Sequence, residues 1–125
     1  MSSSLSTEVV DRLAPFVDRD DLERMRVVTG PPGNWIPLLL GTGAVTLGNQ
    51  VFFRSGRFDP VTPRGLALIG HEAEHVAQYR RLGTAGFLWR YVRGSVTSRF
   101  SHARHPMERD VVELQRRIRT ALEED

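Results

Sequence analysis

The chain contains no cysteine. Disulfide bonds, thiolate nucleophiles and thiolate metal ligands are therefore excluded. Of the side chains that bind transition metals strongly, only the imidazole of histidine and the carboxylates of aspartate and glutamate are left. A transition-metal site in this chain must accordingly be built from histidine and carboxylate ligands.

Lysine is also absent, because all 17 basic residues are arginine. This removes Schiff-base chemistry and a lysine general base. Ten of the arginines fall between Arg80 and Arg119, where only Glu108, Asp110 and Glu113 oppose them. Such a stretch could attract phosphates or an acidic partner. A solvated helix surface is the simpler interpretation, and we do not expect nucleic acid to be a partner.

No apolar run is long enough to cross a bilayer, so we expect a soluble chain without a membrane span. The first residues, Met-Ser-Ser-Ser-Leu-Ser, lack the basic and apolar regions of a secretory signal peptide. We therefore expect a cytoplasmic protein by default, with export by a route that needs no signal peptide left open. A length of 125 residues predicts one domain over residues 1–125.

Residues 1–40 give the weakest signals for regular structure. Apolar residues from Val9 to Val17 recur at helical spacing after two candidate capping residues, Ser6 and Thr7, and Pro15 disturbs that pattern. We expect a short helix there, within a segment of helix and loop whose arrangement the sequence does not fix.

Shorter elements complete this segment. Residues 20–25 suit a helical turn and residues 26–29 suit a strand, whereas the apolar run 35–40 is interrupted by Pro37. Residues 41–125 are then expected to contain the core of the functional site.

A hairpin is predicted by two apolar stretches on either side of Gly48-Asn49. Ala44 to Leu47 and Val51 to Arg54 are rich in β-branched and aromatic residues, and the dipeptide between them suits a tight turn. If the protein binds a peptide, the strand Val51 to Arg54 could take it up as an added strand. The alternative is that this strand only stabilises the hairpin.

A helix from Pro63 to Leu82 is well marked, since Thr62 can cap it and Gly83 can end it. The next helix should run over residues 85–100. We expect its apolar residues to pack in the core rather than on a membrane surface: Phe87, Leu88, Trp89, Tyr91 and Val92. A last helix begins at Pro106 and carries one apolar stripe: Met107, Val111, Leu114, Ile118 and Ala121.

Two histidines share one face of the helix from Pro63. At about 100° per residue, His75 lies only about 40° around the helix from His71 and one turn along it. Gln78 and Leu82 continue this face. The opposite face is apolar and suits the core: Leu66, Ile69, Ala73, Val76 and Ala77.

This spacing predicts a zinc site. Two histidines four residues apart can share one zinc ion, and Glu72 can reach a water molecule in an open coordination position, as in zinc hydrolases. Glu74 fits the reversed pattern His-x-x-Glu-His equally well, so spacing alone leaves the base open between the two carboxylates. The plain alternative is that His71 and His75 are ordinary half-buried residues.

A third protein ligand must come from elsewhere in the chain. Glu108 lies in the first turn of the last helix, at the edge of its apolar stripe, from which a carboxylate can face inward. The candidates after the motif helix are Glu108, Asp110, Glu113, His102 and His105.

Residues Ala44 to Gln78 resemble a zincin-like family of bacterial domains associated with polymorphic toxins and extracellular contractile injection systems. In that family a hairpin strand leads through a turn with proline and threonine into a helix that reads His-Glu-Leu-x-His-Val-x-Gln. The pieces that match are Ala44-Val45-Thr46-Leu47-Gly48-Asn49, Val51-Phe52-Phe53, the turn 56–60, and Leu68-Ile69-Gly70-His71-Glu72-Ala73-Glu74-His75-Val76-Ala77-Gln78.

The resemblance implies a gluzincin-type metallopeptidase with one zinc ion held by two histidines and a glutamate. His105-Pro106-Met107-Glu108-Arg109 is similar to a downstream segment of the family, so Glu108 takes the role of third ligand. The resemblance also favours Glu72 over Glu74 as the base. Here Ala73 replaces the family's leucine, and Glu74 adds a charge.

The fold that we expect is α+β: a small antiparallel sheet packed on the motif helix, with two or three further helices. Gln78 is expected either to line the cleft or to support a histidine. Tyr91, Arg104 and His105 could stabilise an oxyanion or bind substrate.

The function that we expect is zinc-dependent hydrolysis of peptide bonds in a peptide or protein substrate. One alternative is a metal-bound but inactive scaffold that serves a toxin or injection apparatus. The other is a basic interaction domain for nucleic acid or an acidic partner, with the histidines incidental.

Overall fold

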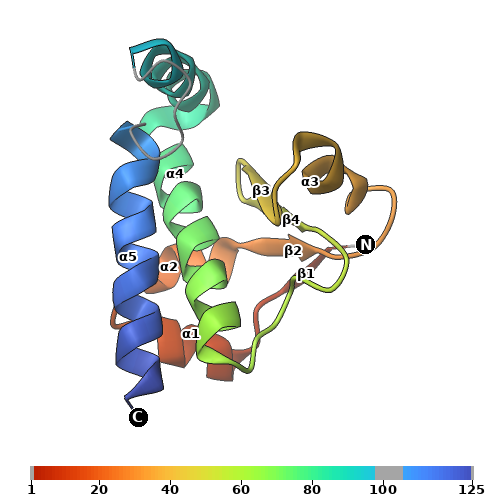
Figure 1. Cartoon of the computed structure of the whole chain (residues 1–125), viewed down its shortest axis with the longest axis vertical. Helices are drawn as coiled ribbons and strands as arrows, with labels where there is room; N and C mark the ends of the chain where they lie inside the picture. The colour runs from red at the N-terminus through yellow and green to blue at the C-terminus, as the bar shows by residue number, and fades with distance from the viewer. Residues whose placement is uncertain (1, 98–105, 125) are drawn as a thin grey trace.

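The computed structural model describes residues 2–97 and 106–124, which form an α+β domain (Figure 1). Two long helices lie side by side and run in opposite directions, and a small sheet lies to one side of them. The expected fold class is confirmed. In chain order the elements are β1 (Ser2–Ser4), α1 (Thr7–Leu13), α2 (Arg19–Arg24), β2 (Arg26–Val28), α3 (Trp35–Leu40), β3 (Ala44–Leu47), β4 (Gln50–Phe53), α4 (Pro63–Thr97) and α5 (Pro106–Glu123).

The sheet is mixed, whereas the sequence predicted an antiparallel one. Its strand order is β1-β2-β4-β3, and the central pair β2 and β4 is parallel, with Val27 opposite Val51. The predicted hairpin of β3 and β4 is present, with Gly48 at φ 67° in its turn. Because β4 lies between β2 and β3, the expectation that its strand could accept a peptide is wrong. The edge strands of the sheet are β1 and β3, and β3 is the edge strand next to β4.

Residues 1–40 contribute more to the fold than their weak signals suggested. The Ser6 side chain caps α1 by accepting a hydrogen bond from the Val9 amide, and α1 buries its apolar face in the core. Pro15 follows the end of that helix. Strands β1 and β2 then form one side of the sheet.

Residues 35–40 form helix α3, although the sequence predicted that Pro37 would interrupt this apolar run. Pro37 is the third residue of α3, where the backbone amide of a helix has no intrahelical partner, so proline is tolerated there. The helix ends at Gly41, whose φ of 71° is left-handed.

Helix α4 is divided at Gly83, where φ is 72° and ψ is 162°. The predicted end of the motif helix is therefore correct. After this break, Phe87 is buried, but Leu88, Trp89 and Val92 are 48%, 68% and 58% exposed. The expectation that all the apolar residues of this helix pack in the core is thus wrong, since nothing in the described part of the chain covers this face. Over residues 2–97 and 106–124, no helix is long and apolar enough to cross a membrane.

The motif helix is held from behind by a fully apolar face. Leu66, Ile69, Ala73 and Val76 have no exposed surface and belong to the main core cluster. That cluster also contains the central strand residue Phe53 and buried residues of α5. Burying one face in this way fixes the rotation of α4, and so directs the opposite, histidine-bearing face toward α5 and β3.

Candidate metal centre

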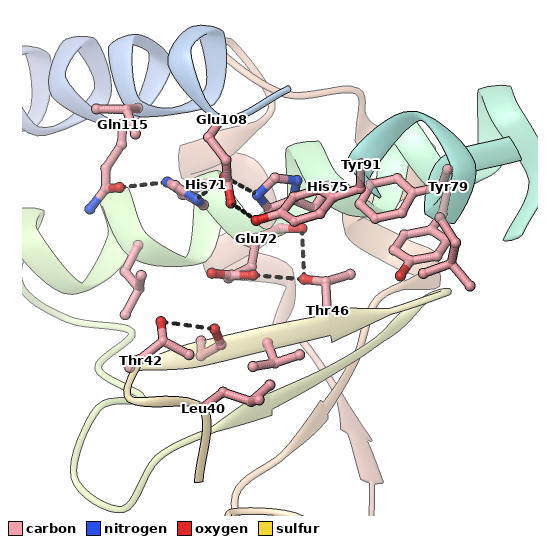
Figure 2. A pocket seen from close by; sticks show the side chains of 17 residues that line it. Leu40, Thr42, Thr46, His71, Glu72, His75, Tyr79, Tyr91, Glu108 and Gln115 are labelled. Carbon is pink, nitrogen blue, oxygen red and sulfur yellow. Dashed lines mark hydrogen bonds and ion pairs between the residues drawn. The ribbon is translucent and has the colours of Figure 1, made fainter. Parts of the chain in front are cut away.

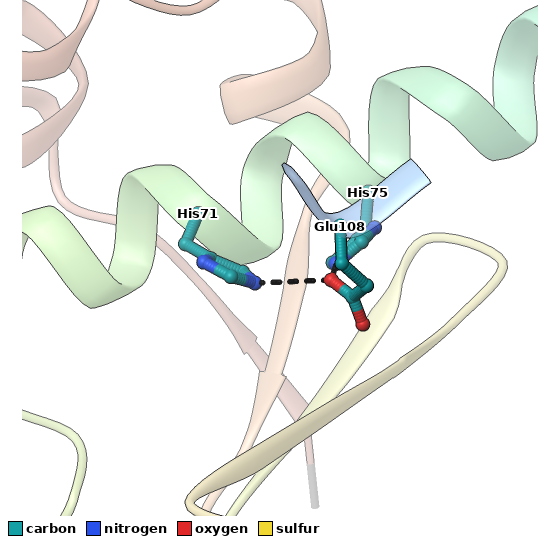
Figure 3. A group of neighbouring side chains, drawn as sticks. All are labelled: His71, His75 and Glu108. Atoms are coloured by element: carbon teal, nitrogen blue, oxygen red, sulfur yellow. Dashed lines mark hydrogen bonds and ion pairs between the residues drawn. The ribbon is translucent and has the colours of Figure 1, made fainter. Parts of the chain in front are cut away.

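Three side chains from two helices converge beside the sheet (Figure 3). The Nε2 atom of His75 lies 2.8 Å from Oε1 of Glu108, and the Nε2 atom of His71 lies 3.6 Å from the same oxygen. One ligand atom from each residue falls within 4.8 Å of the other two, and all three residues are buried. This group could hold a metal ion.

The spacing of these atoms agrees with a shared metal. Two ligand atoms that each lie about 2.0–2.1 Å from a tetrahedral zinc ion are about 3.3 Å apart. The measured separations from Glu108 to the histidines, 2.8 and 3.6 Å, lie on either side of that value. All three ligand atoms lie within 4.8 Å of one another, so adjustments of the side chains could bring them around one ion.

The other nitrogen of each histidine contacts a glutamine. The Nδ1 atom of His71 lies 2.6 Å from Oε1 of Gln115, and Nδ1 of His75 lies 2.9 Å from Oε1 of Gln78. An amide oxygen can only accept, so each Nδ1 must carry the proton. In the neutral ring this leaves the Nε2 lone pair of each histidine directed at the shared position.

The Gln78 side chain is itself anchored, because its Nε2 donates to the Met107 carbonyl at 3.2 Å. Of the two roles expected for Gln78, its contacts match support of a histidine. The residue lies behind His75 and links the motif helix to the start of α5.

Glu108 is oriented by a tyrosine as well as by the histidines. The hydroxyl of Tyr91 donates to its second carboxylate oxygen, Oε2, at 2.8 Å. Burial by itself would raise the pKa of Glu108, but contacts with His71, His75 and Tyr91 outweigh burial and hold that pKa far below its usual value. The carboxylate is therefore ionised. Burial and the hydrogen bond to Glu108 raise the pKa of Tyr91, which stays a neutral donor.

The electrostatics around His75 favour a positive charge. Burial alone would lower the pKa of His75, but the hydrogen bond to Glu108 and the negative charges of Glu72 and Glu108 outweigh it and raise the pKa. A proton on Nε2 or a metal cation can supply that charge. Without a metal ion, a protonated His75 would instead form a hydrogen-bonded pair with Glu108.

The structure places Glu72 and Glu74 in different surroundings. Glu72 is buried, and the Thr46 hydroxyl on β3 donates to its Oε2 at 2.7 Å (Figure 2). Glu74 pairs with Arg81 at 3.1 Å, and its side chain is 25% exposed. Of the two carboxylates that the spacing left open, only Glu72 is among the described residues that line the cleft.

A cleft of about 560 Å³ opens onto this group. Figure 2 shows Glu72 between the histidines and β3, so the edge strand forms one wall of the cleft. Helices α4 and α5 form the opposite wall, which includes Tyr91 and Gln115. The volume is in the range of ordinary ligand pockets.

Two residues of the site were missed from the sequence, Gln115 and Thr46. Gln115 follows Glu108 by seven residues, so both lie on the same face of α5 two turns apart. Thr46 lies two residues after the buried Ala44, so the alternation of the strand points both toward the motif helix. From these periodicities, both residues could have been predicted to face the site.

Of the other candidates for a third ligand, the two that the structure describes do not join the group. Asp110 and Glu113 are exposed on α5. The predictions for His102, Arg104 and His105 lie outside the described residues.

The fold and the site together define an α+β domain with a buried His-His-Glu group able to bind a metal ion. Residues 4–83 match the family model of the eCIS core domain, named for extracellular contractile injection systems, and the chain belongs to that family. No curated protein and no solved structure matches it.

The family match includes the last residue of β1, strands β2 to β4, and the part of α4 that carries His71, Glu72 and His75. The resemblance described from the sequence begins at Ala44. The match corrects this, because it begins at residue 4. Glu108 lies beyond the matched segment, so its place in the site rests on the geometry described above.

Proposed function

We propose that this domain is a zinc-dependent peptidase, in which His71, His75 and Glu108 hold the ion. The observation that supports this most strongly is the convergence of one ligand atom from each of these residues beside the buried carboxylate of Glu72. The donor set of two imidazoles and a carboxylate is one that zinc accepts in catalytic sites. When bound, zinc would polarise a carbonyl group and lower the pKa of a water molecule to about 7.

Glu72 is the general base in this proposal. Its carboxylate lies in the cleft, where it would take a proton from the attacking water and pass it to the leaving amine. The hydroxyl of Thr46 holds Oε2, which leaves the other carboxylate oxygen for this transfer. Tyr91 keeps Glu108 oriented and faces the same cleft.

An extended polypeptide is the substrate that the cleft suits. Within the described chain, β3 pairs only with β4, so the backbone groups along its outer edge have no strand partner, and Ala44 to Thr46 of this strand line the cleft. A substrate strand could pair along that edge, with its scissile carbonyl near the histidines.

The test compares Glu72→Gln with Glu74→Gln, which make the same change two residues apart. Unfolded protein substrates are incubated with zinc-loaded protein, and cleavage is followed by mass spectrometry. Loss of the base should lower the rate about 10²–10⁴-fold in Glu72→Gln, with zinc content unchanged. Glu74→Gln should keep both zinc and activity. Equal activity of the two variants would overturn the assignment of Glu72.

A second function is favoured by the family to which the chain belongs, since the eCIS core domain relates it to an injection system. In this reading, the metal site stabilises a scaffold that serves assembly, and no peptide bond is cleaved. Wild-type protein that carries zinc, yet cleaves neither unfolded substrates nor its own chain, would support the scaffold over the peptidase.

A further inference from the structure

A second hollow, of about 530 Å³, adjoins the metal cleft. The two share Gly43, Leu68 and Gln115 in their walls, so the surface continues from one to the other. Gln115 is the side chain whose Oε1 contacts Nδ1 of His71. The second hollow is also lined by Gly56, Arg57, Asp59, Arg64 and Gly65, so two arginines and one carboxylate supply its charged groups.

Arg64 lies on the same face of α4 as the metal-site histidines. Arg64, Leu68, His71 and His75 follow one another at intervals of four, three and four residues, which is one stripe of a helix. The seven residues from Arg64 to His71 rise about 10 Å. An extended peptide covers that length in about three residues.

Arg57 approaches the hollow from the loop after β4. Its amide donates to the Arg54 carbonyl at 2.9 Å, in a turn that contains Gly56 at φ 79°. The Arg57 Cγ atom lies close to Gly43, at 3.8 Å from the place of a Cβ there. The two arginines thus reach the hollow from two separate segments.

The positive charge in the hollow is not neutralised by ion pairs. Among the described residues, neither Arg57 nor Arg64 has a carboxylate partner. Among the described residues that line the hollow, the one carboxylate is Asp59, which accepts from the amides of Val61 and Thr62 and from the Thr62 hydroxyl. It stays ionised, so the two arginines leave the hollow with an excess of positive charge.

The position of Arg64 is also unfavourable for the helix itself. The first turn of α4 contains no acidic residue, and a cation there opposes the positive end of the helix dipole. A side chain that breaks a local rule without a compensating contact is a candidate for function.

We infer that this hollow is a subsite for a carboxylate of the polypeptide substrate, bound by Arg57 and Arg64 about three residues from the scissile bond. The inference rests on the proposed peptidase function and adds a substrate class, peptides with an acidic group at that distance. The carboxylate can belong to an Asp or Glu side chain or to the C-terminus of the peptide. Gln115, between the hollow and His71, lies along the path of the bound chain.

The test measures binding without turnover. Zinc-loaded Glu72→Gln protein is titrated with fluorescent octapeptides that carry one glutamate at successive positions, each paired with the same peptide carrying glutamine. Every peptide is made with a free and with an amidated C-terminus, which distinguishes a side-chain carboxylate from the terminal one. At the best position, the peptide with glutamate should bind about fivefold tighter than the peptide with glutamine. The effect is modest because both arginine side chains are exposed and water screens their charges.

The preference should disappear when Arg57→Gln and Arg64→Gln are added, and Arg64→Glu should reverse it. The control Arg90→Gln with Arg117→Gln removes the same charge from exposed positions outside both hollows and should keep the preference. Zinc content and melting temperature are measured for each protein to verify the fold.

Two results would overturn the inference. One is equal binding of acidic and neutral peptides at every position. The other is an acidic preference that persists without Arg57 and Arg64, because the carboxylate would then be bound by the metal. Failure of the peptidase proposal is distinguishable, since it appears as absent cleavage by wild-type protein and leaves the binding preference in place.

Discussion

At the level of single residues, two glutamine side chains determine which nitrogen of each histidine is available to bind a metal ion. Gln115 and Gln78 each present an amide oxygen to Nδ1 of a histidine, and each therefore fixes the proton on that nitrogen. Without such partners an imidazole can rotate or change tautomer, and its Nε2 lone pair is no longer directed at the metal position.

Replacing Gln115 with leucine should weaken zinc binding about 10–100-fold, which is typical for loss of a residue that supports a metal ligand. The physical reason is that His71 loses the acceptor for its Nδ1 proton. Zinc affinity is measured by competition with a chromophoric chelator. The matched control is Gln50→Leu at an exposed position of β4, which should leave the affinity unchanged. Equal affinities for wild type and Gln115→Leu would show that this contact does not support the site.

The sequence predicted some site residues because their relation is local. His71 and His75 are one helical turn apart, so the periodicity alone places them together, and burial of the opposite face confirms the orientation. The choice between Glu72 and Glu74 as the base could not be made from local sequence. It depends on Thr46 in β3, which only the tertiary structure brings into contact with Glu72. Arg81, the partner of Glu74, lies seven residues further along the same helix.

The start of α4 packs closely against the backbone of the loop that precedes it. A Cβ added at Gly65 would lie 2.1 Å from the carbonyl oxygen of Asp59, which belongs to the loop that caps the helix. A contact that short requires the loop to move. The first turn of the metal-binding helix therefore needs glycine at this position.

Gly65→Ala should destabilise the protein by about 1–3 kcal/mol, the usual cost of overpacking. Gly86→Ala is the control, in the part of α4 after the break at Gly83, since its Cβ would lie 3.5 Å from Leu82 Cβ, an ordinary contact. That change should stabilise by up to about 1 kcal/mol through helix propensity. Both are measured by urea denaturation. A Gly65→Ala protein as stable as Gly86→Ala would contradict the described packing of this loop.

Elements with local signals were predicted more closely than those set by distant pairing. The hairpin of β3 and β4 and the motif helix up to Gly83 follow from turn and cap residues. The parallel pairing of β2 with β4 joins segments more than twenty residues apart, and no local pattern specifies it. The mixed sheet and the edge position of β3 therefore had to come from the structure.

At the scale of the whole molecule, an ion pair between Asp21 and Arg80 connects the N-terminal segment to the metal-binding helix. Asp21 in α2 is fully buried and accepts two hydrogen bonds from Arg80 in α4, at 2.7 and 3.0 Å. The family match from residue 4 to residue 83 includes both partners. This contact holds α2 against α4 near the end of the motif helix.

Asp21→Asn should lower the free energy of unfolding by about 1–3 kcal/mol, because a buried charge partner of Arg80 is lost. The lower part of that range is expected, since the Arg80 side chain is 41% exposed and can turn to water. Asp20→Asn, the exposed neighbour, should change stability by less than about 0.5 kcal/mol. Thermal unfolding of the two variants decides this, and equal melting temperatures would argue against a structural role for the Asp21 pair.

The central claim is that His71, His75 and Glu108 form a zinc site, and the number of zinc ions per chain tests it most directly. Purified protein is dialysed with trace zinc and measured by elemental analysis, alongside His71→Ala and Glu108→Gln. We expect about one zinc ion per chain in wild type and far less in both variants. A wild-type protein without zinc, or a His71→Ala protein that keeps a full equivalent, would contradict the account.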